Sequence, residues 1–285
     1  MLTDQIADIK VNCIFLSKNQ RHFQIGVARV LVLKILASLK GVLLLRYAFF
    51  IVVGFFATLA ATMGNAADSD DAPSVTPSGL KPNYPADYNC TPISSPYGSW
   101  IDVDGTRRDE IHTGVDVGRL GEWILAPASG TVRAAWKANW KWGTEGALLI
   151  QHDRDDLNLT SGPKFYYSEF DHLDFDEIKH FSEGQKVKRG DRLARVTHPG
   201  ENQTYLPEVH WEVWKADHDE LTWRTNRYDA PDWWNDSAEL IDPLSLLGLN
   251  NPPTEDKRVA IVPFVKGKDY DGFRGFTYIM PCTPK

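Results

Sequence analysis

The side chains best suited to chemistry lie in a short segment near the end of the chain, residues 207–214. Apolar and polar residues alternate there, so a strand would place Glu208, His210 and Glu212 on one face. A carboxylate and an imidazole that lie side by side can bind a metal ion or move a proton. The segment therefore predicts one wall of a metal or acid–base site.

About a hundred residues upstream, His112 and Asp116 stand four positions apart with Gly114 between them. Zinc in hydrolases is usually held by three protein ligands, and the fourth position is left to a water whose pKa falls to about 7. His112, Asp116 and His210 supply such a ligand set. Glycine lets the backbone turn, so the first two ligands need not lie on a helix. Taken alone, this spacing is a weak signal.

Short runs typical of β-strands, separated by Gly, Pro and Asp, must position these residues. They are 123–125, 130–136, 147–152, 164–170, 192–196 and 208–214, with a reversal at Gly190-Asp191. A short helix is expected at 243–247 and one further strand at 259–265. Residues 217–242 look irregular, and no repeat, heptad pattern or nucleotide-binding loop is present. The pattern predicts a mainly β fold.

Seven motifs follow one another in a fixed order between about residues 92 and 247. They are Ser95-Pro96-Tyr97-Gly98, His112-Thr113-Gly114-Val115-Asp116, Ala126-Pro127-Ala128-Ser129-Gly130-Thr131-Val132, Asp171-His172-Leu173, the run 184–196, Val209-His210-Trp211-Glu212-Val213 and Asp242-Pro243-Leu244. This order resembles the lysostaphin-type, or LytM-type, zinc endopeptidases of bacterial cell walls. The resemblance implies a compact antiparallel β-sheet or sandwich with a narrow groove, and hydrolysis of peptide bonds in peptidoglycan.

The same resemblance assigns roles to individual residues. His112, Asp116 and His210 match the family's Zn²⁺ ligands. His172 matches the histidine of its Tyr-x-His-Leu segment, which helps to stabilise the developing oxyanion or the attacking water, although Phe170 replaces the tyrosine here.

Glu208 is the main departure, because it replaces the first histidine of the family's His-x-His motif. A glutamate beside zinc is a competent general base in other metallopeptidases. It could instead become a fourth ligand and close the site. Two functions follow: an active endopeptidase, or a catalytically impaired domain that binds cell wall or activates a cell-wall amidase.

Two other candidate side chains, Glu212 and His198, each allow two interpretations. Glu212 either orients the His210 imidazole or is satisfied by solvent or a basic neighbour. His198 either replaces the lost imidazole or is a solvated loop residue. We expect Trp211 in the core, and surface positions for three histidines, His152, His180 and His218. All ten tryptophans follow the leader, and their clusters either pack in the core and loops or stack on sugar rings.

The first 67 residues form a basic leader with a net charge of +5, and since the whole chain carries −7, the rest carries −12. An apolar run, 48–62, is followed by the small residues Ala66 and Ala67, as in a cleaved signal peptide. The alternative is a membrane anchor spanning 42–61. We expect an exported protein of the periplasm or cell envelope, with an acidic body that does not bind nucleic acid.

Two cysteines, Cys90 and Cys282, remain after the leader, and an exported pair permits a disulfide. Two free thiols are the alternative. Composition divides the chain into the leader 1–67, a flexible linker 68–87, a metallopeptidase domain 88–250 and a C-terminal extension 251–285. The sequence leaves the oligomeric state open.

Overall fold

The computed structural model describes residues 74–285, except for positions 141 and 201. The described residues belong to one compact unit. The predicted leader 1–67, with its signal peptide or membrane anchor, and the first residues of the predicted linker lie outside them. Within the described part of the chain, neither helix has the length and hydrophobicity needed to cross a membrane.

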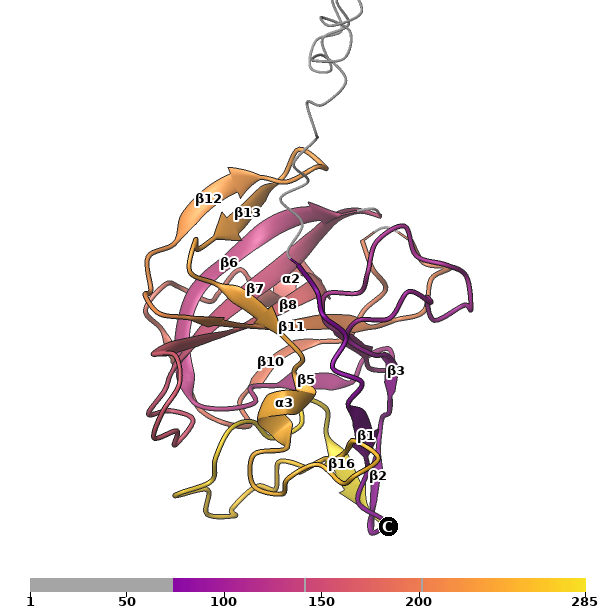
Figure 1. The fold of residues 1–285 in the computed structure, drawn as a ribbon. Coiled ribbons are helices and arrows are strands. Elements are labelled where there is room, and N and C mark those ends of the chain that lie inside the picture. Colours follow the sequence, from indigo (N-terminus) through magenta and orange to yellow (C-terminus); the bar gives the residue numbers. More distant parts are fainter. Residues whose placement is uncertain (1–73, 141, 201) are drawn as a thin grey trace, which may run out of the picture. The chain divides into compact units, whose positions relative to one another are not determined.

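One antiparallel sheet of eight strands forms the body of the domain (Figure 1). Seven strands run in the order β3 (Ile93–Ser95), β4 (Val115–Val117), β11 (Val209–Ala216), β8 (Phe165–Leu173), β7 (Gly143–Asp153), β6 (Gly130–Trp140) and β9 (Lys186–Val187). The eighth, β14 (Glu239–Ile241), pairs with β11. The prediction of a mainly β, antiparallel fold is confirmed.

Four small two-stranded sheets and two short helices complete the unit. The pairs are β5 (Trp123–Leu125) with β10 (Arg192–Arg195), β12 (Thr222–Thr225) with β13 (Pro231–Trp234), β1 (Lys81–Asn83) with β15 (Arg258–Ala260), and β2 (Tyr88–Cys90) with β16 (Cys282–Pro284). Only β1 and β15 run parallel among these described pairs. The helices are α2 (Phe175–Ile178) and α3 (Leu244–Leu247).

The predicted strands are present with shifted ends. The run expected at 130–136 extends to residue 140, and the run expected at 164–170 extends to residue 173. The tail strand expected at 259–265 is shorter, because only Arg258–Ala260 forms a strand there, β15. The helix begins at Leu244, whose backbone N–H donates to the carboxylate of Asp242.

The larger core lies on one face of the sheet. Alternation along β4 and β11 sends Val115, Val117, Val209, Trp211 and Val213 to this face, and each is fully buried. Trp211 stacks on Phe170 of the neighbouring strand β8. Burying these apolar side chains provides the main stabilisation of the fold, and it sends the polar residues of the same strands to the opposite face.

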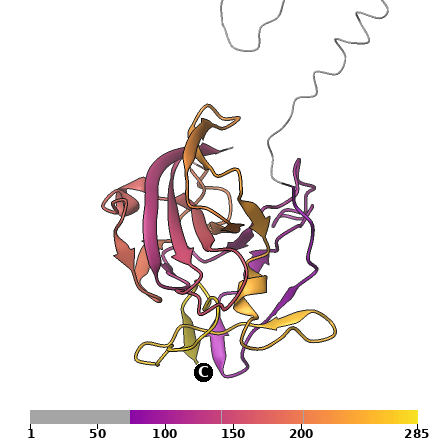
Figure 2. The same ribbon diagram turned by 60° about the vertical axis from the view of Figure 1, so that its left-hand side comes forward.

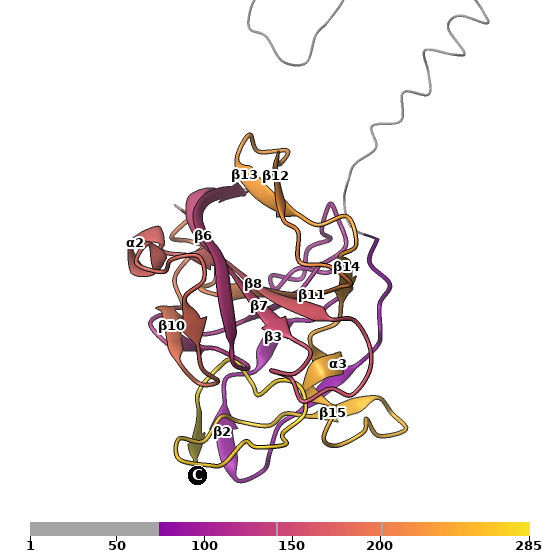
Figure 3. The same cartoon turned by 90° about the vertical axis from the view of Figure 1, so that its left-hand side faces the viewer.

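The opposite face is covered in part by the β12–β13 hairpin, in a region expected to be irregular. Figure 3 shows the hairpin over one end of β6. Trp233 of β13 packs on Tyr167 of β8, and the indole N–H of Trp136 donates to the carbonyl of Pro231 at 3.0 Å. The hairpin thereby closes a second, smaller core on this face.

Both ends of the described chain are part of the larger core. Residues 74–87 were expected to be linker, but β1 pairs with β15, and Val75 and Leu80 pack against the core. Likewise, the predicted extension 251–285 contributes Phe276 and Tyr278, which are fully buried. The compact unit thus includes residues on both sides of the predicted boundaries at 88 and 250, where a few apolar residues in segments of polar composition complete the core.

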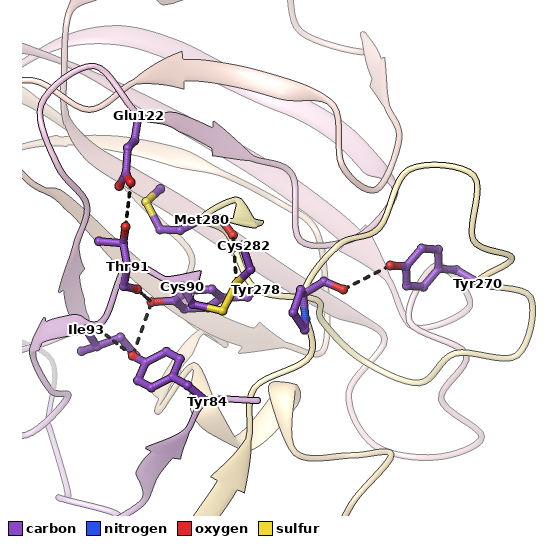
Figure 4. The surroundings of a disulfide bond; sticks show 10 residues. Tyr84, Cys90, Thr91, Ile93, Glu122, Tyr270, Tyr278, Met280 and Cys282 are labelled. Atoms are coloured by element: carbon purple, nitrogen blue, oxygen red, sulfur yellow. Dashed lines mark hydrogen bonds between the residues drawn. A yellow bond between two sulfur atoms is a disulfide. The ribbon is translucent and has the colours of Figure 1, made fainter. Parts of the chain in front are cut away.

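A disulfide joins Cys90 of β2 to Cys282 of β16 and confirms the predicted pairing. The two residues lie opposite each other in the antiparallel pair, and Figure 2 shows the C-terminal strand beside β2. Around the disulfide (Figure 4), the Tyr278 hydroxyl donates to the carbonyl of Thr91 at 2.6 Å, and the Thr91 hydroxyl donates to Glu122 at 2.7 Å. The bond ties the tail to the start of the domain.

We expect the double substitution Cys90→Ser and Cys282→Ser to lower the free energy of unfolding substantially. The cysteines are 192 residues apart, and loop-closure entropy for so long a loop predicts a loss of about 5 kcal/mol. Urea unfolding of the two proteins, followed by tryptophan fluorescence, measures this difference. Unfolding midpoints that coincide would contradict it.

Candidate metal site

The pairing of β4 with β11 places Asp116 directly opposite His210. Residues directly opposite in an antiparallel pair send their side chains to the same face, and here that face is opposite the larger core. His112 reaches the same place from the loop before β4. Its backbone is fixed by two hydrogen bonds, from Gly98 N–H to its carbonyl at 2.8 Å and from its own N–H to the Ser99 carbonyl at 3.0 Å.

Three side-chain atoms from these residues converge. His112 Nε2 lies 2.9 Å from Asp116 Oδ1 and 3.0 Å from His210 Nδ1. His210 Nδ1 lies 2.8 Å from the same Asp116 oxygen. Sequence reasoning proposed these three residues as metal ligands, and among the described residues they are the cluster whose ligand atoms gather within 4.8 Å.

The bonds on the outer atoms of the two imidazoles decide which nitrogen carries the hydrogen. His112 Nδ1 lies 2.9 Å from the carbonyl oxygen of Pro96, which can only accept. His210 Nε2 lies 3.1 Å from a carboxylate oxygen of Glu212. Neutral imidazoles therefore donate outward and direct a lone pair inward.

Two inward lone pairs and a carboxylate oxygen at these distances repel one another unless a metal ion or a shared proton lies among them. Two imidazole nitrogens and one carboxylate oxygen are a donor set that suits zinc. Outer hydrogen bonds to a carbonyl and a carboxylate are typical of metal-binding histidines. The residues present thus fit a zinc ion.

Arg108 supports the third ligand, and sequence reasoning missed it. Its Nη2 donates to Asp116 Oδ2 at 2.8 Å and to Ser95 Oγ at 3.0 Å, which leaves Oδ1 free to face the imidazoles. Burial raises the pKa of Asp116, but the neighbouring His112 and His210 hold it well below its usual range. Asp116 is therefore ionised at neutral pH.

Glu212 contacts the outer nitrogen of His210, as predicted by the interpretation that it orients this imidazole. It is buried, and its second oxygen accepts from the indole N–H of Trp214 at 2.9 Å. Burial lowers the pKa of His210, but hydrogen bonds to the carboxylates of Asp116 and Glu212 raise it well above its usual value. The site is strongly attractive to positive charge on both sides of this imidazole.

Gly114 is required by close approach, where the sequence suggested a turn. A Cβ at this position would lie 2.4 Å from the backbone oxygen of Trp211 and 3.0 Å from His210 Nε2. Any larger residue would separate the loop from β11 and pull His112 away from its two partners.

Glu208 lies just before β11 and forms an isolated bridge with Thr197, whose carbonyl accepts its backbone N–H at 3.0 Å. Its side chain is buried, and within the described residues Oε2 has no hydrogen-bond partner. Burial, together with the charge of Asp116, raises the pKa of Glu208 to about 9. It is close enough to Asp116 and His210 for their charges to act on it, but it is not one of the three clustered ligand residues.

His172 reaches the site through an irregularity in β8. The pairing of β7 with β8 shifts register between Gly146 and Leu148, and His172 has a φ of 62°. Such bulges re-aim side chains: Leu173 returns to the larger core, while the His172 ring lies 6.0 Å from that of His210 between centroids. The structure thus brings His172 next to the three candidate ligands.

A second residue that the sequence did not reveal, Glu145 of β7, binds His172. One of its carboxylate oxygens lies 2.5 Å from His172 Nδ1, and both side chains are buried. No motif flagged Glu145, because only the folding of β7 against β8 brings it to the imidazole.

The remaining histidines have other roles. His152 was expected at the surface but is fully buried: its ring nitrogens bond the Ser129 carbonyl at 2.7 Å and the Ser168 hydroxyl at 3.0 Å. Burial lowers its pKa to about 4, so it is a neutral core residue. His198 bonds the Tyr205 carbonyl within its own loop.

One comparison with known proteins covers the segment that carries this site. Residues 110–222 match Peptidase family M23, which confirms the predicted family resemblance for the segment that contains all three candidate ligands. A search of curated protein sequences gave no match.

Several solved structures are similar. The catalytic domain of a mutant of the prophage-encoded M23 protein EnpA from Enterococcus faecalis is 22% identical, covering 48% of this chain and 87% of that one, with a TM-score of 0.31. LytU is 24% identical, covering 47% of this chain and 79% of that one, with a TM-score of 0.34. The catalytic domain of lysostaphin from Staphylococcus simulans is 21% identical, covering 44% of this chain and 79% of that one, with a TM-score of 0.28.

Replacing Glu212 by glutamine should weaken zinc binding by roughly tenfold, because the amide removes the charge that favours the His210 orientation. Competition with a chromophoric chelator measures the affinity. Glu169→Gln is the matched control, since Glu169 is also buried and lies opposite Glu212 in the β8–β11 pair. Equal affinities for the two variants would show that Glu212 does not support the metal ligand.

Proposed function

Because residues 110–222 belong to Peptidase family M23, we propose that this protein is an exported, zinc-dependent endopeptidase that hydrolyses peptide bonds in peptidoglycan. The observation that carries the proposal is the convergence of His112 Nε2, Asp116 Oδ1 and His210 Nδ1 within 3.0 Å. Their outer hydrogen bonds fix the atoms that face a metal. Export accords with the leader composition and with the disulfide.

His112, Asp116 and His210 would hold the zinc. When bound, zinc supplies Lewis acidity that polarises the scissile carbonyl and the attacking water. The protein's part is to keep three ligand atoms in place, which Pro96, Arg108 and Glu212 do from outside.

In this proposal Glu208 would accept the proton of the attacking water. Its Oε2 is buried and has no hydrogen-bond partner within the described residues, so taking up a proton there would break no existing hydrogen bond. The high pKa of Glu208 arises from burial and from the charge of Asp116. A divalent cation on the adjacent ligands would lower this pKa, because positive charge favours the ionised carboxylate.

His172 would stabilise negative charge on the scissile carbonyl oxygen. Its Nδ1 is occupied by Glu145, so Nε2 is the nitrogen that can donate to the substrate. A preorganised donor in a water-poor site is worth more than the same donor in solvent. Glu208 and His172 thereby divide proton transfer and charge stabilisation between two segments.

The alternative is a non-hydrolytic domain of the same family that binds cell wall or activates a cell-wall amidase. In that case Glu208 would close the site or leave the reaction without a base.

We expect the purified protein to bind one zinc ion and to release peptides from peptidoglycan sacci. A chelator should abolish release, and added zinc should restore it, because the three ligands act only with the metal. Mass spectrometry of the metal content and chromatography of the products measure both effects. Bound zinc without products, together with retention of the protein on sacci, would favour the non-hydrolytic alternative.

Glu208→Gln should lower kcat at least 100-fold, as expected for loss of a general base, while the zinc content stays at one. Kinetics on soluble cross-linked muropeptides measure the loss. A control is Glu239→Gln, since Glu239 is exposed and pairs with Lys215. Full activity in the Glu208 variant would refute the assignment of the base.

A further inference from the structure

We propose that Glu145 is a positioning residue that fixes the orientation and the protonated nitrogen of His172. This inference rests on the proposed function, because it concerns a side chain of the same site. It adds a residue that neither the family motifs nor the metal ligands include.

The geometry of the pair is that of a charge-assisted hydrogen bond. Glu145 Oε2 lies 2.5 Å from His172 Nδ1, at the short end for an imidazole and a carboxylate. A carboxylate oxygen accepts, so Nδ1 carries the hydrogen. Whether the imidazole is neutral or charged, Nδ1 is therefore unavailable to the substrate, and Nε2 is the nitrogen that serves the reaction.

Burial makes this pairing exclusive. The Glu145 side chain is only 1% exposed and that of His172 only 9%. Within the described residues, the other carboxylate oxygen of Glu145 has no hydrogen-bond partner. Removing one member of such a pair leaves an uncompensated buried group, which is strongly unfavourable. Within the described residues the carboxylate thus has one hydrogen-bond partner, and its charge is directed at His172.

The surroundings hold the ring in the same orientation. The positive φ of His172 is unusual for a residue other than glycine and is maintained only when neighbouring structure requires it. Trp140 and Trp142 present their rings edge-on to the imidazole, with centroids 6.2 and 5.6 Å away. The strained backbone brings the ring to the site, the indoles limit its tilt, and Glu145 determines its rotation.

His172 lies in the bulged segment of β8, between Phe170 and Leu173, and Glu145 of β7 lies next to Gly146, where the pairing resumes. A continuous ladder would keep strict alternation along β8 and would not place both Asp171 and His172 on the face opposite the larger core. The bulge therefore serves the site by bringing the imidazole to the carboxylate.

Two substitutions test the proposal. Glu145→Ala should lower kcat on cross-linked muropeptides roughly 100-fold, since a wrongly oriented imidazole loses its part in the reaction. Glu145→Gln should lower kcat less, because its amide oxygen can still accept a hydrogen bond from His172 Nδ1. Neither should change KM more than twofold or alter the zinc content. Glu169→Gln, a buried carboxylate whose partner is the Trp233 indole at 2.7 Å, should retain full activity.

A second measurement is independent of catalysis. In protein labelled with ¹⁵N-histidine, the His172 imidazole should carry its hydrogen on Nδ1, and this resonance, assigned by its absence from His172→Gln, should be lost in Glu145→Ala. The same signal should persist in Glu169→Gln.

The outcomes separate the two proposals. An inactive wild-type protein would overturn the proposed function, and the Nδ1 hydrogen would still decide the role of Glu145. Unchanged kcat in a folded Glu145→Ala variant, or a His172 without a hydrogen on Nδ1, would overturn the positioning role. If Glu145→Ala does not fold, the kcat and the imidazole spectrum of Glu145→Gln decide instead.

Discussion

Asp116 and His210 face each other because β4 and β11 pair in one register. A slip of β4 by one residue would send Asp116 into the larger core and bring Val115 and Val117 to the opposite face. Those valines and Trp211 are fully buried, so the slip would expose apolar surface and bury charge at once. The spacing of the candidate ligands is thus maintained by the core on the other side of the sheet.

Around this pair, three side chains of the site are each held by a second polar residue. Arg108 comes from a loop, Glu212 from the strand that carries His210, and Glu145 from β7. Each bonds the atom of a functional side chain that points away from the cluster. The arrangement fixes orientation and leaves the inward atoms unengaged, which is what metal binding and charge stabilisation require.

The alternation of apolar and polar residues was sufficient to predict the face that carries Glu208, His210 and Glu212, because successive side chains of a half-buried strand point to opposite faces. It could not reveal Glu145 or Arg108, whose importance depends on a bulge and on a loop folding back. The same limit explains His152, which follows an apolar run like a surface residue at a strand end but lies against Phe276 from the tail. Contacts between distant segments have no signature in either segment alone.

The pairing of β1 with β15 and of β2 with β16 has a consequence for how the domain is made. The first strands of the domain have their partners among its last residues, so the native core cannot close until the whole chain is available. Contacts of such long sequence separation slow folding. A nascent chain would therefore stay incompletely folded until the residues around Cys282 arrive, and the sheet that carries the candidate ligands would gain its full core only then.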